Sequence, residues 1–339
     1  MNAPTATGGR LRAYMQVLAA VLYYFLARSV ARQGAQGLAS DRWSPLVGQA
    51  MLVFLLLLGY AAMGFWLNRQ VNPVREQGLP LRAGWTGEAG VGLAVGWGLA
   101  VVCVLPMAVI GGIVVSIATG HSAWGWLAVD AAFFALAALA EEVAFRGYGF
   151  QLLVDAVGPF GASLGFAAYY ATVQSYLPRA GRASFLVSIA LGLALSAAYL
   201  RSRALWVSWG LNFGWKASRA LLFGLTVSGI SSHSPVVEGD PLGPNWLTGG
   251  GFGLDGSWFA FLALLAVLPV VFKVTRELNY RYNAPQIVPG GIPVDLDAAA
   301  RAQHEAAMGE AAPVTPTLVQ IGPATPAAPL AEPPSGNSR

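Results

Sequence analysis

Charge is scarce in this chain. Of its 339 residues only 11% are charged, 55% are hydrophobic, and the mean hydropathy is +0.55. Soluble domains carry roughly 25% charged residues, so this composition excludes a chain that faces water over most of its surface and indicates a lipid bilayer as solvent. The net charge of +4 comes mostly from arginines scattered at the ends of apolar runs, which is typical of loops between membrane spans. Membrane lipid is therefore an expected partner, and nucleic acid is not.

Cysteine and histidine are also rare. The one cysteine, Cys103, excludes an intrachain disulfide and any cysteine-based metal cluster, and we interpret it as a small buried apolar residue. The three histidines are His121, His233 and His304, and none has a helical partner at metal-ligand spacing. Each is interpreted as a solvated loop residue, although His233 is the one that could fold back over a site.

Long apolar runs predict an all-α fold, a polytopic transmembrane helical bundle of about eight spans. Helices are the default because lipid cannot satisfy free backbone groups, and these runs are too long for barrel strands. The first run is interpreted as a retained span because no good cleavage site follows it. The predicted spans are Tyr14–Val30, Leu46–Trp66, Val91–Ile117, Ala123–Leu153, Gly158–Tyr176, Phe185–Leu200, Ala204–Leu225 and Trp258–Phe272.

The loops predict three regions and an orientation. Residues 1–122 hold the first three spans, residues 123–282 hold a core of five, and residues 283–339 form an Ala/Pro-rich tail predicted to be disordered, with a candidate short helix around Asp295–Met308. Lys and Arg favour the side of the two termini by about two to one, which places both termini in the cytoplasm of a multi-pass cell-membrane protein, plasma or inner. Asp255 falls in the segment assigned to the outer side.

Two groups of ionisable residues interrupt the apolar runs. In ALAALAEEVAFRGYG, Glu142 and Arg146 are four residues apart and share a helix face, whereas Glu141 points about 100° away. An ionisable residue inside a span is costly and is a functional hypothesis by default. Glu141 is therefore either a general base free to reach water or part of a charge network at a helix end, and the residues alone leave both interpretations open.

The second group lies in LWVSWGLNFGWKASRALLFGL. Asn212 and Lys216 are again four residues apart, and Lys216, near the middle of its span, is expected to face a carboxylate. Arg219 is expected to extend to a membrane interface, with its charge in water. Trp209 and Trp215 are expected to line a cavity next to this group.

The order of these motifs carries a family resemblance. The strings are EEVAFRG, beginning at Glu141, GFAAYYATV with Tyr170, and GLNFGWK with Asn212 and Lys216. In order and spacing they resemble the three motifs of the CPBP family of intramembrane endopeptidases, which includes CAAX prenyl proteases and bacteriocin-processing enzymes. The resemblance covers roughly Trp124–Leu265.

The resemblance implies a cavity in which glutamates and histidines activate water against a peptide bond. Family members are usually described as metallopeptidases with a divalent, zinc-like ion, acting near a prenylated C-terminus or on peptides. By resemblance Glu141 is the base, Glu142 and Arg146 support it, Tyr170 and Asn212 take the two histidine places, and Lys216 takes the Asn/Asp place.

The departures from the family pattern concern the metal. Tyr and Asn are poor ligands for a zinc-like ion, so Tyr170 and Asn212 do not replace the two histidines. Lys216 adds a cation, and two glutamates, one arginine and one lysine sum to zero, which neutralises a buried site without a metal. No cofactor is therefore expected in this member.

Three functions stay open at this point. The first is an endopeptidase acting on a hydrophobic or prenylated peptide through glutamate-activated water. The second is a catalytically impaired pseudoprotease that serves as a membrane scaffold, maturation or immunity factor. The third is a proton-coupled secondary transporter, which is disfavoured because no inverted repeat is visible. The sequence leaves the oligomeric state open.

Overall fold

The computed structural model describes residues 6–117, 121–230, 236–283, 301 and 304, and the described part is mostly helical. The chain divides into two units, Met1–Asn283 and Ala284–Arg339. The all-α prediction is confirmed. The predicted tail, including the candidate helix around Asp295–Met308, lies outside the described residues apart from Arg301 and His304, both exposed.

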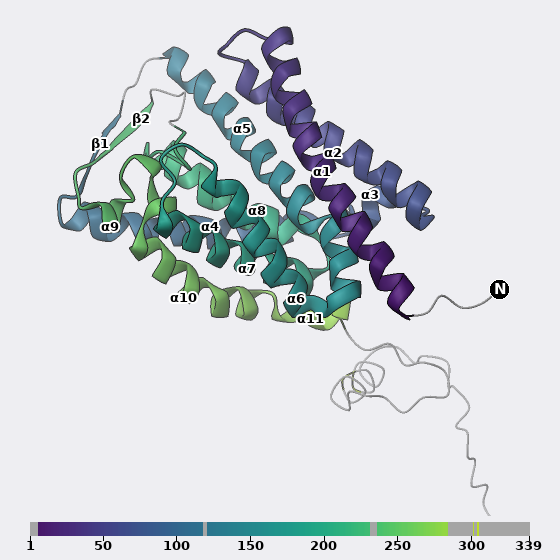
Figure 1. The fold of residues 1–339 in the computed structure, drawn as a ribbon. Helices are drawn as coiled ribbons and strands as arrows, with labels where there is room; N and C mark the ends of the chain where they lie inside the picture. The colour runs from purple at the N-terminus through teal and green to yellow at the C-terminus, as the bar shows by residue number, and fades with distance from the viewer. Residues whose placement is uncertain (1–5, 118–120, 231–235, 284–300, 302–303, 305–339) are drawn as a thin grey trace, which may run out of the picture. The chain divides into compact units, whose positions relative to one another are not determined.

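The predicted apolar runs lie mainly in long helices (Figure 1). Short elements connect or follow them. The long helices are α1 (Ala6–Leu38), α2 (Ser44–Asn68), α4 (Trp85–Val109), α5 (His121–Arg146), α6 (Tyr148–Ser175), α7 (Arg182–Ser202), α8 (Leu205–Ala217) and α10 (Trp258–Val274). The short elements are α3 (Pro73–Glu76), α9 (Asn245–Thr248), α11 (Arg276–Asn283), strands β1 (Ile113–Ile117) and β2 (Val237–Pro241), the π-helical turn η1 (Ser218–Leu222) and the 3₁₀ turns η2 (Gly250–Phe252) and η3 (Leu254–Gly256).

Four of the described helices are long and apolar enough to cross a membrane, namely α1, α2, α4 and α7. A fifth span is added if α10 and α11, which meet at 56°, count as one. The other predicted spans, in α5, α6 and α8, are helical but are not among these helices. Helix α6 is kinked, and α8 has only 13 residues. The finding supports a membrane protein, and the number eight stays a prediction.

Two predicted span boundaries are wrong. The third span ends at Val109 rather than Ile117, because the chain turns at Gly111 (φ 71°) and continues as β1, which pairs antiparallel with β2. The fourth span ends at Arg146, and after Gly147 the last six residues of the predicted run already belong to α6. Helix α6 itself breaks at Gly158 (φ 84°, ψ 166°), a backbone conformation that glycine adopts without steric cost.

The helices of the first unit pack in two groups. Helices α1, α2 and α5 lie side by side, and α4, α7, α8 and α10 pack against one another (Figure 1). Helix α6 contacts α1, α5 and α7, and α8 contacts α5, so these two helices join the groups. The site described below lies where α5, α6 and α8 meet.

Two glycine pairs bring α4 and α8 into backbone contact. Gly92 and Gly96 on α4 face Gly210 and Gly214 on α8, and each pair has the small-xxx-small spacing that lets membrane helices approach closely. A Cβ atom at Gly96 would lie 2.2 Å from the carbonyl oxygen of Leu211, and those at Gly92 and Gly210 would lie 2.1 Å from carbonyl oxygens of the facing helix. This crossing sets the position of α8.

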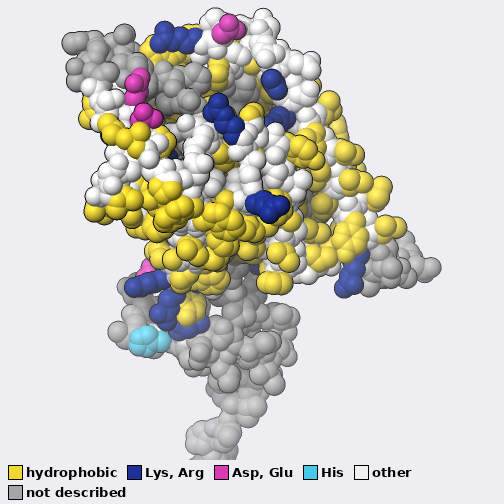
Figure 2. Space-filling model, turned by 60° about the vertical axis from the view of Figure 1, so that its left-hand side comes forward, with side chains coloured by type: hydrophobic (Ala, Val, Ile, Leu, Met, Phe, Trp, Pro, Cys, Tyr) yellow, Lys and Arg dark blue, Asp and Glu magenta, His cyan; other side chains and the backbone are white. Residues whose placement is uncertain are grey.

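Large apolar side chains cover much of the molecular surface. Figure 2 shows them as a broad region, with Lys and Arg gathered mainly beyond its edges. Phe54, Trp66 and Leu105 are more than half exposed, and so are many residues of α1. Soluble monomers rarely expose extended apolar regions. This surface fits a lipid environment.

Candidate functional site

Helices α5 and α8 meet through two carboxylates and their partners. Lys216 Nζ lies 2.5 Å from Glu141 Oε1, so the predicted pairing of this lysine with a carboxylate is present. Asn212 Nδ2 lies 3.0 Å from Glu141 Oε2 and also 3.0 Å from Glu142 Oε1, and so links the two glutamates. The i,i+4 spacing of Asn212 and Lys216 places both on the α8 face that meets α5.

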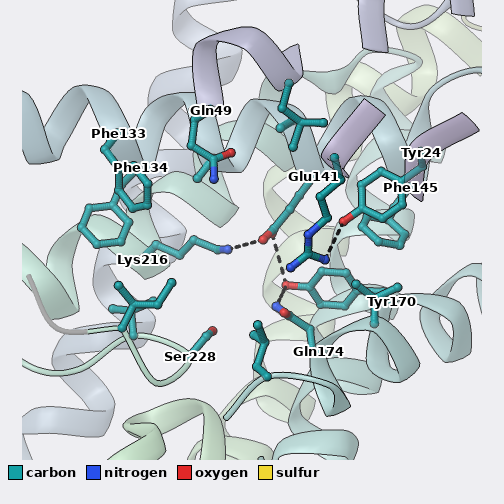
Figure 3. Close-up of a pocket in the computed structure, with 18 residues that line it drawn as sticks. Tyr24, Gln49, Phe133, Phe134, Glu141, Phe145, Tyr170, Gln174, Lys216 and Ser228 are labelled. Atoms are coloured by element: carbon teal, nitrogen blue, oxygen red, sulfur yellow. Dashed lines mark hydrogen bonds and ion pairs between the residues drawn. The ribbon is translucent and has the colours of Figure 1, made fainter. Parts of the chain in front are cut away.

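Helix α6 completes the ring of donors around Glu141. The Tyr170 hydroxyl donates a hydrogen bond to Glu141 Oε2 at 3.3 Å, and Gln174 Nε2 donates to the Tyr170 oxygen at 2.9 Å (Figure 3). Gln174 was missed by the sequence analysis, although it lies four residues after Tyr170 on the same helix face.

The second glutamate has a closed environment. Glu142 and Arg146 are 0% and 1% exposed and form an ion pair at 3.4 Å, while Arg146 also donates to the carbonyl oxygen of Gly192 on α7 at 3.2 Å. The Glu141 side chain, by contrast, is 20% exposed. The structure thus brings all six predicted site residues together in two groups. Glu142 and Arg146 form a buried pair, and Lys216, Asn212 and Tyr170 surround the more accessible carboxylate of Glu141. Their part in any reaction stays a prediction.

Glu141 and Lys216 line a cavity of about 120 Å³. Ser228 and Gln174 supply polar groups to its wall, and aromatic rings supply much of the rest (Figure 3). Arg28 of α1 lines it as well. The sequence analysis missed Arg28 and Ser228, because no spacing along the chain relates α1 or the segment after α8 to the motif helices.

Arg219 does not extend to an interface as predicted. It is fully buried, its NH1 atom lies 2.8 Å from Asp255 Oδ1, and its Nε donates to the backbone oxygen of Trp215 at 2.8 Å. The prediction failed because it considered α8 alone. The neutralising carboxylate comes from η3, in a segment assigned by sequence to the outer loop.

Asp255 is the centre of this second cluster. Its Oδ1 accepts a hydrogen bond from Trp215 Nε1 at 3.1 Å, and its Oδ2 accepts from the backbone N and the hydroxyl of Ser228 at 3.1 and 2.7 Å. Burial by itself raises the pKa of Asp255, but the Arg219 guanidinium and the Ser228 hydroxyl outweigh it and lower the pKa below the ordinary aspartate value. Asp255 thereby holds Ser228 at the cavity wall.

The two predicted cavity tryptophans do not line the cavity described here. Trp215 is turned toward Asp255, and Trp209 Nε1 donates to the carbonyl oxygen of Ala135 at 2.9 Å. Both rings therefore fix α8 against its neighbours instead of facing the site.

The residues at the site do not fit a zinc-like ion. Among the described residues, no group of three or more His, Cys, Asp or Glu side chains could hold a metal. Lys216, Asn212 and Tyr170 already surround the accessible carboxylate, and none of them is a good zinc ligand. Of the histidines, His304 is exposed, His121 begins α5, and His233 lies outside the described residues.

The comparisons with known proteins agree with the motif order. Residues 121–218 match the family model of type II CAAX prenyl endopeptidases, described as Rce1-like. No curated protein and no solved structure matches the chain. The matched segment runs from α5 through α8 and contains all six predicted site residues. The match supports a relationship between this chain and the CPBP/CAAX protease family.

Proposed function

We propose that this relative of the CAAX-type membrane proteases hydrolyses a peptide bond of a hydrophobic or lipidated substrate, with water activated by Glu141 and no bound metal. One observation carries the proposal: of the two neighbouring glutamates, Glu141 alone reaches the cavity, whereas Glu142 is enclosed with Arg146. A general base must reach water or the proton that it takes, and Glu141 meets that condition.

The cavity supplies the remaining groups for metal-free hydrolysis. Glu141 accepts a proton from water as the water oxygen attacks the carbonyl carbon, and the resulting oxyanion receives a hydrogen bond from the Lys216 ammonium group. Glu141 then returns the proton to the amine nitrogen as the C–N bond breaks. Because an ammonium group has three donors, Lys216 can contact Glu141 and the oxyanion together.

The first test is Glu141→Gln in the full chain, reconstituted in liposomes with a fluorogenic hydrophobic peptide. Losing a positioned base lowers rates about 10²–10⁴-fold, so cleavage should fall by that factor. The matched control is Glu88→Gln, which removes another buried carboxylate with an ion pair, to Arg82, away from the cavity. Equal cleavage by wild type and Glu141→Gln would overturn the proposal.

The metal-free part has its own test. We expect mass spectrometry of the purified wild-type protein to find well under one transition-metal ion per chain, and the same in a Glu141→Ala, Glu142→Ala double variant. The reason is that the Lys216 ammonium group, the Asn212 amide and the Tyr170 hydroxyl already surround Glu141. About one ion per wild-type chain, absent from the double variant, would show a metallopeptidase instead.

A second candidate function is a non-catalytic ligand-binding protein. It is favoured by the three donors on Glu141, since Lys216, Asn212 and Tyr170 already occupy the carboxylate that would have to contact the attacking water. Binding of a hydrophobic peptide by the wild-type protein with no cleavage would select this function.

The proposal includes a location. We place the chain in the cell membrane with both termini in the cytoplasm, because Lys and Arg favour that side. Protease accessibility of an epitope at either end, in intact and in opened cells, tests the orientation. Cleavage of a terminal epitope in intact cells would reverse it.

A further inference from the structure

A larger cavity adjoins the cavity at Glu141. This second pocket, of about 490 Å³, lies toward the turn between α1 and α2, where Asp41 and Ser44 are on its wall. The two spaces have several wall residues in common, and together we call them the passage. The shared residues are Arg28, Gln49, Leu52, Phe133 and Ile230.

Charges along the inner passage do not cancel. Glu141 pairs with Lys216 and Glu142 pairs with Arg146, which leaves Arg28 as an additional cation at the junction of the two spaces. The guanidinium of Arg28 contacts the neutral hydroxyl of Tyr24 at 3.3 Å. No carboxylate of the described residues lies within ion-pair distance of it. Arg28 therefore has hydrogen-bond donors and a positive charge available to a ligand.

We propose that Arg28 determines the specificity of the cavity by binding a carboxylate of the ligand. This inference rests on the site of the proposed function and names the chemistry of its substrate: an apolar peptide with a carboxylate close to the bond next to Glu141. The planar guanidinium binds a planar carboxylate through two parallel hydrogen bonds. A doubly charged phosphate would be repelled more strongly by Glu141, which lines the same cavity.

The walls of the passage fit the rest of such a ligand. Leu52 and Phe133 are apolar and lie on both the inner and the outer space, so they can bury apolar side chains next to the bound carboxylate. Gln49 lies at the same junction and offers an amide to the peptide backbone (Figure 3).

The test measures binding and needs no cleavage. Three dansyl-labelled peptides of five leucine and alanine residues are titrated with the full chain in detergent, and anisotropy gives Kd. One has a free C-terminal carboxylate, one a C-terminal amide, and one an amide with an internal glutamate. We expect the free acid to bind at least about tenfold more tightly than the plain amide, which is the factor for 1.4 kcal/mol. The third peptide shows whether a side-chain carboxylate serves equally.

Variants of α1 assign the preference to one residue. Arg28→Gln should reduce the ratio of the two Kd values to about one, whereas Arg32→Gln, one turn further along α1 and lining the outer space alone, should keep it. Arg28→Lys keeps the charge without the paired donors and should give an intermediate ratio, which guards against a folding defect in Arg28→Gln.

Three results would overturn the inference: equal binding of acid and amide by the wild type, a preference that persists in Arg28→Gln, or no binding of any of the peptides. An acid preference without cleavage would refute the proposed hydrolysis alone. Cleavage that depends on Glu141 but ignores the C-terminal charge would refute the role of Arg28 alone.

Discussion

Helix α8 and the π-helical turn η1 that follows it hold two ion-pair clusters that differ in access. Through Asn212 and Lys216, α8 meets Glu141, which is partly exposed to a cavity. Through Trp215 of α8 and Arg219 of η1, the same stretch of chain meets Asp255, where the guanidinium is fully buried. In both clusters the two residues are four apart, so their sequence spacing is the same.

This difference in access separates a charge that a ligand can reach from one that only holds the fold together. A closed, paired charge costs free energy to desolvate and holds elements together, and removing one partner leaves an uncompensated charge. A charge at a cavity can exchange its partner for a ligand. On this comparison the Glu141 cluster is the proposed site of chemistry, and the Asp255 cluster supports the wall of that site through Ser228.

Removing Asp255 should have the largest effect on stability. Asp255→Ala leaves Arg219 as a buried, unpaired cation, so we expect the free energy of unfolding to fall by about 3–5 kcal/mol. Unfolding in mixed detergent–SDS micelles, followed by tryptophan fluorescence, measures it. The control Asp240→Ala removes an exposed carboxylate on β2 and should change stability by less than about 0.5 kcal/mol. Equal losses in the two variants would contradict the closed character of the cluster.

Both clusters depend on the position of α8, which Gly96 sets. A Cβ at Gly96 would lie 2.2 Å from the Leu211 oxygen and 2.7 Å from the Trp215 nitrogen, so Gly96→Ala should cost about 1–3 kcal/mol through overpacking. Gly98→Ala, on the same helix with no atom within 4 Å of the added Cβ, should be neutral or slightly stabilising. The same unfolding assay compares them. A stable Gly96→Ala variant would show that α4 and α8 can separate without loss.

Lys216→Gln should have the smallest effect on stability and still impair function. Glu141 faces the cavity and keeps hydrogen bonds from Asn212 and Tyr170, so we expect a loss of about 1 kcal/mol, the net contribution of one hydrogen bond. Peptide cleavage should fall about 10²-fold, the effect of losing one oxyanion donor. A stability loss as large as that of Asp255→Ala would remove the distinction between the two clusters.

The pairings within the motif helices were predictable because the residues concerned are close in sequence. The pairing of Glu142 with Arg146, and the shared face of Asn212 and Lys216, follow from four-residue separations on one helix. The burial of Arg219 was not predictable in this way, since Asp255 lies 36 residues further along the chain. Nor was the approach of α4 to α8 recognised, although both Gly-xxx-Gly pairs are visible in the sequence.

The sequence by itself determined the lipid environment, the helical class and the composition of the site, because hydropathy and i,i+4 spacing are properties of single segments. Only the tertiary structure decided which charges are enclosed and which face the cavity, where Arg28 enters it, and which carboxylate neutralises Arg219. Burial and ion pairing are set by neighbours on other elements. Here those neighbours come from α1, α6 and η3. Their separation from the motif residues along the chain does not predict how close they lie in space.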